Sequence, residues 1–144
     1  MAKRILVPLD RSDMADSVLA LVGDLARSSG GAVRLLHVAP VPKARIADNG
    51  HVVAYESQEM ERIESKRQEA LQRAAECHLE GVPFETVVRF GRPVKEIIRE
   101  SEAFSADLIA LPTSRRSWLG RALAGVADRV FRSSPVPVLL LGER

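Results

Sequence analysis

Five short, mostly apolar runs, separated by stretches of helical length, constrain most strongly what this chain can fold into. The runs are RILVPL (4–9), AVRLLHV (32–38), FETVVRF (84–90), DLIAL (107–111) and VPVLLL (136–141). Runs of this kind are typical of strands that are covered on both faces in a parallel sheet. Strands that alternate with helices predict an α/β fold with right-handed crossovers and helices on both faces of the sheet.

Helix signals fill the stretches between the runs. Val18, Leu21 and Val22 recur at helical spacing and predict one apolar stripe. Pro93 is at a favoured first-turn position of another helix, and an apolar stripe over 119–130 predicts a further one. A long charged helix is expected over 55–80.

Two features of the middle of the chain are interpreted from local pattern. The single cysteine, Cys77, lies in the long helical pattern and is interpreted as a small core residue. Residues 40–54 contain two prolines, an Asn-Gly pair and mixed polarity, so this segment is predicted to be an irregular loop.

Composition limits the possible classes of function. The 144 residues suit one domain over 1–144, and a single cysteine excludes an internal disulfide. The net charge of +2 and an aromatic content of 4% argue against nucleic-acid binding. No apolar run approaches the roughly 20 residues that span a bilayer. Since the N-terminus leads directly into a strand without a signal-peptide pattern, we expect a cytoplasmic protein with no membrane partner.

Several segments together resemble the universal stress protein family. They are ILVPLDRSD, LLHV, GRPVKEII, DLIAL and GVADRVFRSSPVPVLLL, and they cover essentially the whole chain in the family's order and spacing. The resemblance implies a five-stranded parallel sheet of order 3-2-1-4-5, of the adenine nucleotide alpha hydrolase-like, Rossmann-like type. It also implies a homodimer through antiparallel pairing of the last strands, with Val136, Val138 and Leu140 in the interface. The alternative is an edge strand that is merely buried.

Some members of this family bind ATP, and they resemble one another in a loop G-x-x-G-x(9)-G-[S/T] after the fourth strand. On this chain these positions fall at Pro112, Arg115, Gly125 and Val126; a second placement puts Ala124 and Gly125 at the last pair. Proline has no amide hydrogen, arginine adds a side chain where backbone would approach phosphate, and valine lacks a hydroxyl. The loop is therefore predicted to be degenerate.

Other positions of the family's nucleotide site are kept. In ATP-binding members the nucleoside is met at positions that correspond to Asp10 and its neighbours Pro8 and Leu9, to Val38, and to Leu111. An Asp at such a strand end can accept hydrogen bonds from a ribose or a base. It can also cap the following helix, which requires no ligand.

Arg115 and Arg116 are the remaining candidates for binding. They follow the fourth strand at a strand-to-helix turn, where they could hold a phosphate, a sulfate or an acidic partner. The alternative is two solvated arginines on a loop.

No pattern in the chain predicts a catalytic or metal site. His37, His51 and His78 lack ligand-like spacing, and there is no GxSxG or Walker sequence. The leading hypothesis is a non-catalytic stress-response protein that acts through an unidentified protein partner and has no certain cofactor. The second is a module that binds ATP or AMP with help from Arg115 and Arg116, and the third is an enzyme that hydrolyses nucleotide slowly.

Overall fold

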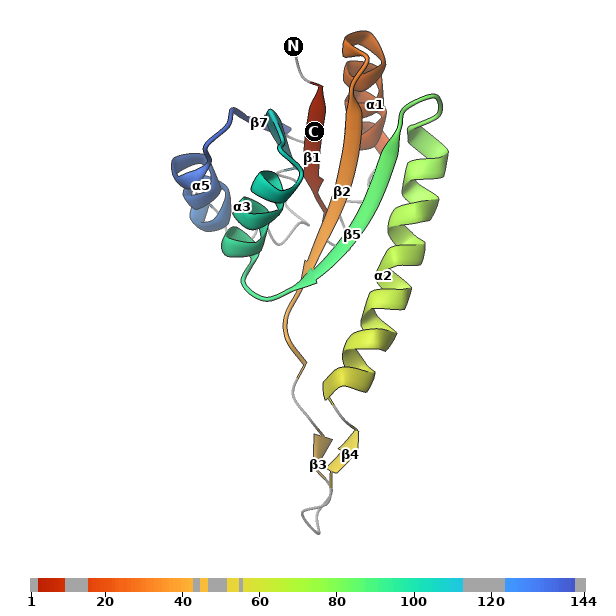
Figure 1. Ribbon diagram of the computed structural model, residues 1–144, viewed down its shortest axis with the longest axis vertical. Helices are drawn as coiled ribbons and strands as arrows, with labels where there is room; N and C mark the ends of the chain where they lie inside the picture. The colour runs from red at the N-terminus through yellow and green to blue at the C-terminus, as the bar shows by residue number, and fades with distance from the viewer. Residues whose placement is uncertain are drawn as a thin grey trace.

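The computed structural model describes residues 3–9, 16–42, 45–46, 52–54, 56–112 and 124–141. Its main sheet has five parallel strands in the order β5-β2-β1-β6-β7 (Figure 1). The strands are β1 (Arg4–Pro8), β2 (Ala32–Ala39), β5 (Phe84–Phe90), β6 (Leu108–Pro112) and β7 (Val138–Leu141). Numbered along the chain as the five predicted strands, this order is 3-2-1-4-5, so the predicted fold is confirmed.

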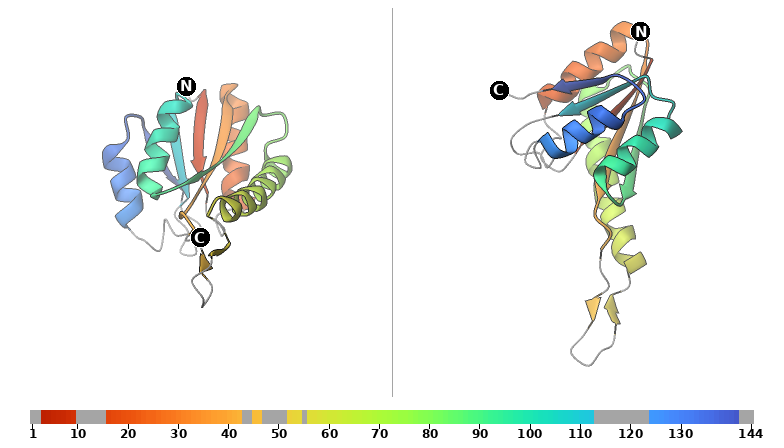
Figure 2. Two further views of the ribbon diagram at one scale, coloured as in Figure 1. Left: turned by 60° about the horizontal axis from the view of Figure 1, so that its bottom comes forward. Right: turned by 90° about the vertical axis from the view of Figure 1, so that its left-hand side faces the viewer.

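Helices cover both faces of the sheet (Figure 2). The helices are α1 (Asp16–Ser29), α2 (Glu56–His78), α3 (Pro93–Ala103) and α5 (Ala124–Ser133). One core cluster joins α1 and α2 to the sheet, and a second joins α3 and α5 to the opposite face. Within the part of the chain that the structure describes, no helix combines the length and the apolar content needed to cross a membrane.

Strand β1 is buried on both of its faces, as its uninterrupted apolar sequence predicts. Ile5 and Val7 belong to the cluster under α1 and α2, whereas Leu6 belongs to the cluster under α3 and α5. All three side chains have 0% exposure. Alternate side chains of a strand point to opposite faces, so one short run supplies both layers of the core.

Two predictions about helix faces are wrong. Cys77 is exposed, because it lies about 200° around α2 from the buried Ala75. Leu21 is 51% exposed on α1, whereas Val18 and Val22 of the same predicted stripe are buried, together with Leu19 and Ala26.

The segment over 40–54, predicted as an irregular loop, contains a small hairpin. Strand β3 (Arg45–Ile46) pairs antiparallel with β4 (Val52–Ala54). Figure 1 shows this pair beyond the end of the sheet, next to the N-terminal end of α2. The sequence signal for it is the Asn49-Gly50 pair between the two strands, a dipeptide that favours tight hairpin turns.

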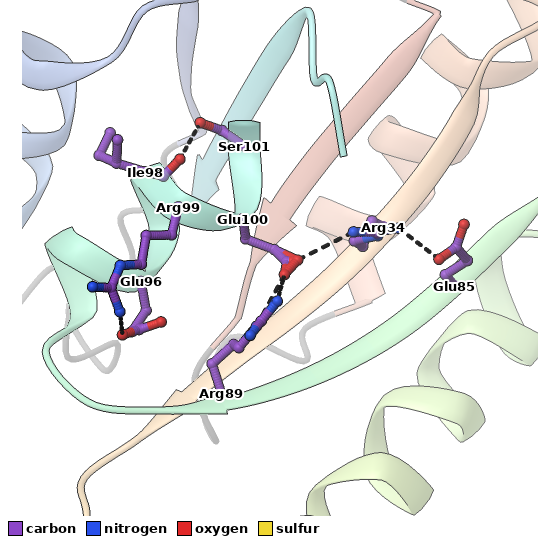
Figure 3. A network of polar contacts seen from close by, with 8 residues as sticks. All are labelled: Arg34, Glu85, Arg89, Glu96, Ile98, Arg99, Glu100 and Ser101. Carbon is purple, nitrogen blue, oxygen red and sulfur yellow. Dashed lines mark hydrogen bonds and ion pairs between the residues drawn. The ribbon is translucent and has the colours of Figure 1, made fainter. Parts of the chain in front are cut away.

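A buried carboxylate connects α3 to the sheet (Figure 3). The side chain of Glu100 is 1% exposed, and one of its oxygens accepts a 3.1 Å hydrogen bond from Arg34 on β2. The other oxygen accepts bonds of 3.0 Å and 2.7 Å from Arg89 on β5. Arg34 also donates to Glu85 at 2.7 Å, and its guanidinium lies 4.4 Å from the centre of the Phe104 ring. The carboxylate is thus held by two strands at once.

We expect Glu100→Ala to lower the free energy of unfolding by about 3 kcal/mol, because it removes the buried partner of two arginines and leaves the partly buried Arg34 with Glu85 alone. Chemical denaturation of the variant and the parent measures the change. Glu102→Ala is the matched control, since Glu102 is an exposed glutamate on the same helix and should cost less than about 0.5 kcal/mol. Equal losses for the two variants would show that the buried ion network contributes nothing specific.

Candidate functional site

The carboxyl ends of the parallel strands meet around the end of β1. Strand β1 pairs with β2 on one side and with β6 on the other, so the strand order reverses here. Open α/β sheets bind their ligands beyond such a reversal. Pro8 ends β1, Leu9 follows it, and Leu111 and Pro112 end β6. The structure therefore brings these predicted positions to one edge of the sheet.

The predicted side chains at this edge belong to the core. Leu9 and Leu111 have 0% exposure, and Val38 has 6%. Leu9 packs in the cluster under α1 and α2, whereas Val38 and Leu111 pack in the cluster under α3 and α5. A ligand at this edge would consequently meet the backbone of these residues rather than their side chains.

Three backbone polar groups at this edge form hydrogen bonds within the fold. The amide of Leu9 donates to the carbonyl of Leu36 at 2.7 Å, and the amide of Gly91 donates to the carbonyl of Ala39 at 2.9 Å. The carbonyl of Leu9 lies 2.9 Å from Nδ1 of the buried His37, which must carry a proton to donate to it. Pro112 has no amide hydrogen.

The predicted phosphate-binding positions lie partly outside the described residues. Asp10, Arg115 and Arg116 are not among the residues that the structure describes. Pro112 is the buried last residue of β6 and pairs with Leu141 of β7. Gly125 lies in the first turn of α5. The side chain of Val126 is half-buried and packs against the cluster under α3 and α5.

A groove between α3 and α5, which the sequence analysis did not find, is a concave feature of the described residues. It has a volume of about 720 Å³. Its lining residues are Arg92, Pro93, Val94, Lys95, Ile98, Arg99, Glu102, Val126, Arg129 and Ser133. The sequence signal for it is the spacing of Arg92, Lys95 and Arg99, which places three cations on one side of a helix.

The residues predicted for a dimer interface differ in exposure. Val136 and Val138 are half-buried and pack against the cluster under α3 and α5. Leu140 is 50% exposed and its neighbour Leu139 is 38% exposed. In the described part of the chain β7 pairs with β6 alone, so its outer edge has no strand beside it. Phe131 on α5, which the sequence analysis did not single out, is 60% exposed.

The described residues bring no three metal-binding side chains together. No group of three or more His, Cys, Asp or Glu side chains gathers within the described ranges. Of the three histidines, His37 is buried in β2 and His78 ends α2, whereas His51 falls outside the described residues.

The sequence matches the model of one protein family. The family is described as the universal stress protein family, and the match covers residues 1–142. Among curated proteins, Universal stress protein MJ0531 of Methanocaldococcus jannaschii is 31% identical over 144 residues. That alignment covers 96% of this chain and 81% of the relative.

Solved structures share the fold. The hypothetical protein MJ0577 superposes with a TM-score of 0.78 at 22% identity, and the match covers 100% of this chain and 98% of that one. A universal stress protein from Archaeoglobus fulgidus, solved in complex with dAMP, gives a TM-score of 0.60 at 20% identity and covers 96% of each chain. At these identities the likeness establishes the fold.

Gly91 gives a direct test of how this edge is built. Its φ of +144° suits glycine, and an added Cβ would lie 3.0 Å from a carboxylate oxygen of the buried Glu96. We expect Gly91→Ala to cost about 1–3 kcal/mol of stability in thermal or chemical unfolding.

The matched control is Gly81→Ala. Gly81 has a φ of +76° with nothing within 4 Å of the added Cβ. Gly81→Ala should therefore lose only the stability that backbone strain costs, about 1–2 kcal/mol. Adding Glu96→Ala to Gly91→Ala should recover the part that is due to the close contact. No recovery would refute the role given to Glu96.

Proposed function

The chain belongs to the universal stress protein family, and we propose that it is a non-catalytic stress-response protein that acts through protein contacts. In this proposal its ATP-binding loop is degenerate. The observation that carries it is the state of the backbone at the carboxyl ends of the strands. The amides of Leu9 and Gly91 are engaged within the sheet, and Pro112 has none to offer.

The general requirements for phosphate binding support the proposal of a degenerate loop. Phosphate is held at strand-to-helix junctions by free backbone amides and by glycines that let those amides approach. Pro112 stands at the first glycine position of the family's ATP-binding loop. It is the last residue of β6 and pairs with Leu141 of β7. The valine at position 126 has no hydroxyl and packs into the core.

The polar groups in the described core support a non-catalytic role. Both oxygens of the buried Glu100 accept hydrogen bonds from arginines, so this carboxylate is committed to structure. Nδ1 of His37 donates to a backbone carbonyl. General acid–base catalysis needs a group within reach of a substrate proton, and neither of these two buried groups offers one.

A second candidate function is the binding of a nucleoside monophosphate. The Archaeoglobus fulgidus relative was solved with dAMP, a ligand with one phosphate instead of three. Such a ligand needs less of the glycine-rich loop than ATP does. Arg115 and Arg116 would then neutralise the single phosphate, while Asp10 would meet the ribose or the base.

We expect nucleotide-stripped protein to give no saturable heat when ATP is titrated to millimolar concentration in a calorimeter, because the triphosphate lacks its amide cradle. ADP and AMP are titrated in parallel, and circular dichroism confirms folding. Micromolar binding of ATP would overturn the leading proposal.

AMP binding without ATP binding would favour the second candidate. In that case Arg115→Ala/Arg116→Ala should weaken the affinity for AMP, since the variant removes the two charges proposed to meet the phosphate. Pro112→Gly restores one amide and should strengthen binding of the phosphate. An affinity for AMP that neither variant changes would place the ligand elsewhere.

The protein contacts of this proposal include a homodimer through β7. Among the described residues no strand pairs with the outer edge of β7, and Leu139 and Leu140 of this strand are exposed. Pairing with a second β7 would extend the sheet across the dimer and cover the leucines. Phe131 adds exposed apolar surface on the helix that precedes this strand. The proposal also includes a cytoplasmic location, with which the exposed free thiol of Cys77 agrees.

We expect Leu140→Glu to convert a dimer into a monomer, because it places a charge where two β7 strands would meet. Light scattering coupled to size exclusion measures the mass. Leu21→Glu is the matched control, since Leu21 is 51% exposed and Leu140 is 50% exposed. A monomeric parent protein, or a dimer that survives Leu140→Glu, would contradict the interface.

A further inference from the structure

The groove between α3 and α5 has an apolar floor. Val94 and Ile98 line it from α3, Val126 lines it from α5, and all three are half-buried against the second core cluster. Removing this floor from water favours association with another apolar surface. The groove is lined by α3, α5 and the residue before α3, and it shares one residue, Val126, with the predicted phosphate-binding positions.

Cations surround this floor. Arg92, Lys95 and Arg129 are exposed, and none of them forms an ion pair with another residue in the described ranges. Arg99 donates to Glu96 at 3.2 Å and is itself 61% exposed. Among the described lining residues, Glu102 is the single acidic one. The rim therefore has a clear excess of positive charge.

The start of α3 adds to this potential. Arg92 is its N-cap residue and makes no side-chain capping bond, and Pro93 occupies the first turn. The N-cap residue therefore brings a positive charge to the start of the helix, and the acidic residue of the first turn, Glu96, is buried and paired with Arg99. Acidic groups near this end of the groove would be stabilised by both the side chains and the helix.

We propose that this groove docks an acidic amphipathic helix of a partner protein. The inference rests on the proposed function of acting through protein contacts and names the chemistry of the partner. Carboxylates of the partner would face Arg92, Lys95 and Arg129, while an apolar stripe at i, i+3, i+4 and i+7 would cover Val94 and Ile98. Opposite charges along the rim then fix the orientation of the helix.

The dimensions suit such an occupant. The 11 residues of α3 span about 16 Å, which is about three turns of a parallel or antiparallel helix. A volume of about 720 Å³ accommodates several large side chains. Nucleic acid fits less well, because the lining residues that the structure describes include no aromatic side chain on which a base could stack.

The test uses the full chain and three fluorescent synthetic peptides of about four helical turns. The first has a leucine stripe flanked by glutamates. The second replaces the glutamates with lysines, and the third keeps the glutamates but scatters the leucines. Fluorescence anisotropy measures binding at low and high salt. We expect saturable binding of the first peptide alone, weakened by salt because exposed charges are screened.

Charge reversal locates the bound peptide. Lys95→Glu/Arg129→Glu should weaken its affinity about tenfold or more, since two attractive contacts become repulsive. The control is the single variant Arg132→Glu. Arg132 is 76% exposed on the same helix, pairs with Asp128, and does not line the groove, so this variant should leave the affinity within about twofold of the parent.

Several results would overturn the docking proposal. They are no saturable binding, equal binding of all three peptides, or an equal loss of affinity in Arg132→Glu. Self-association of the parent that Lys95→Glu/Arg129→Glu abolishes would assign the groove to a second copy of this chain instead. None of these outcomes depends on the nucleotide titration or on Leu140→Glu, so the groove can fail while the proposed function stands.

Discussion

Strand β1 has no face in contact with water, and the rest of the structure follows from that constraint. Ile5, Leu6 and Val7 are fully buried, so layers of helix must cover the sheet from both sides. The chain meets this demand by placing β2 on one side of β1 and β6 on the other. The reversal of strand order at the end of β1 is a direct result, and it creates the edge at which related folds bind ligands.

At that edge backbone groups form hydrogen bonds within the protein. The amide and the carbonyl of Leu9 are both engaged, the latter by the imidazole of His37. A glycine-rich loop does the opposite, because it leaves amides free to meet an anion. Pro112 cannot supply such an amide at all. The family's fold is thus retained here, and the proposal of a changed phosphate loop rests on these groups.

The strands β1, β2 and β6 were predictable because each is a continuous, mostly apolar run of residues. A strand that is buried on both faces tolerates few polar residues. Helix faces were less predictable. Leu21 fits the apolar stripe of α1 yet is exposed, since a helix that covers a sheet buries a narrower arc than its apolar residues span. The candidate groove was not predictable, because Arg129 joins the cations of α3 only through the packing of α5 beside α3.

The two sites are connected through α5. In the loop pattern that the family resemblance implies, Gly125 and Val126 stand at the last glycine and at the hydroxyl position. Val126 packs against the core and lines the floor of the groove. Under the proposal of a degenerate loop, one apolar side chain therefore takes the place of a phosphate contact and forms part of the surface that would meet a partner helix. Both features then depend on how α5 packs against α3.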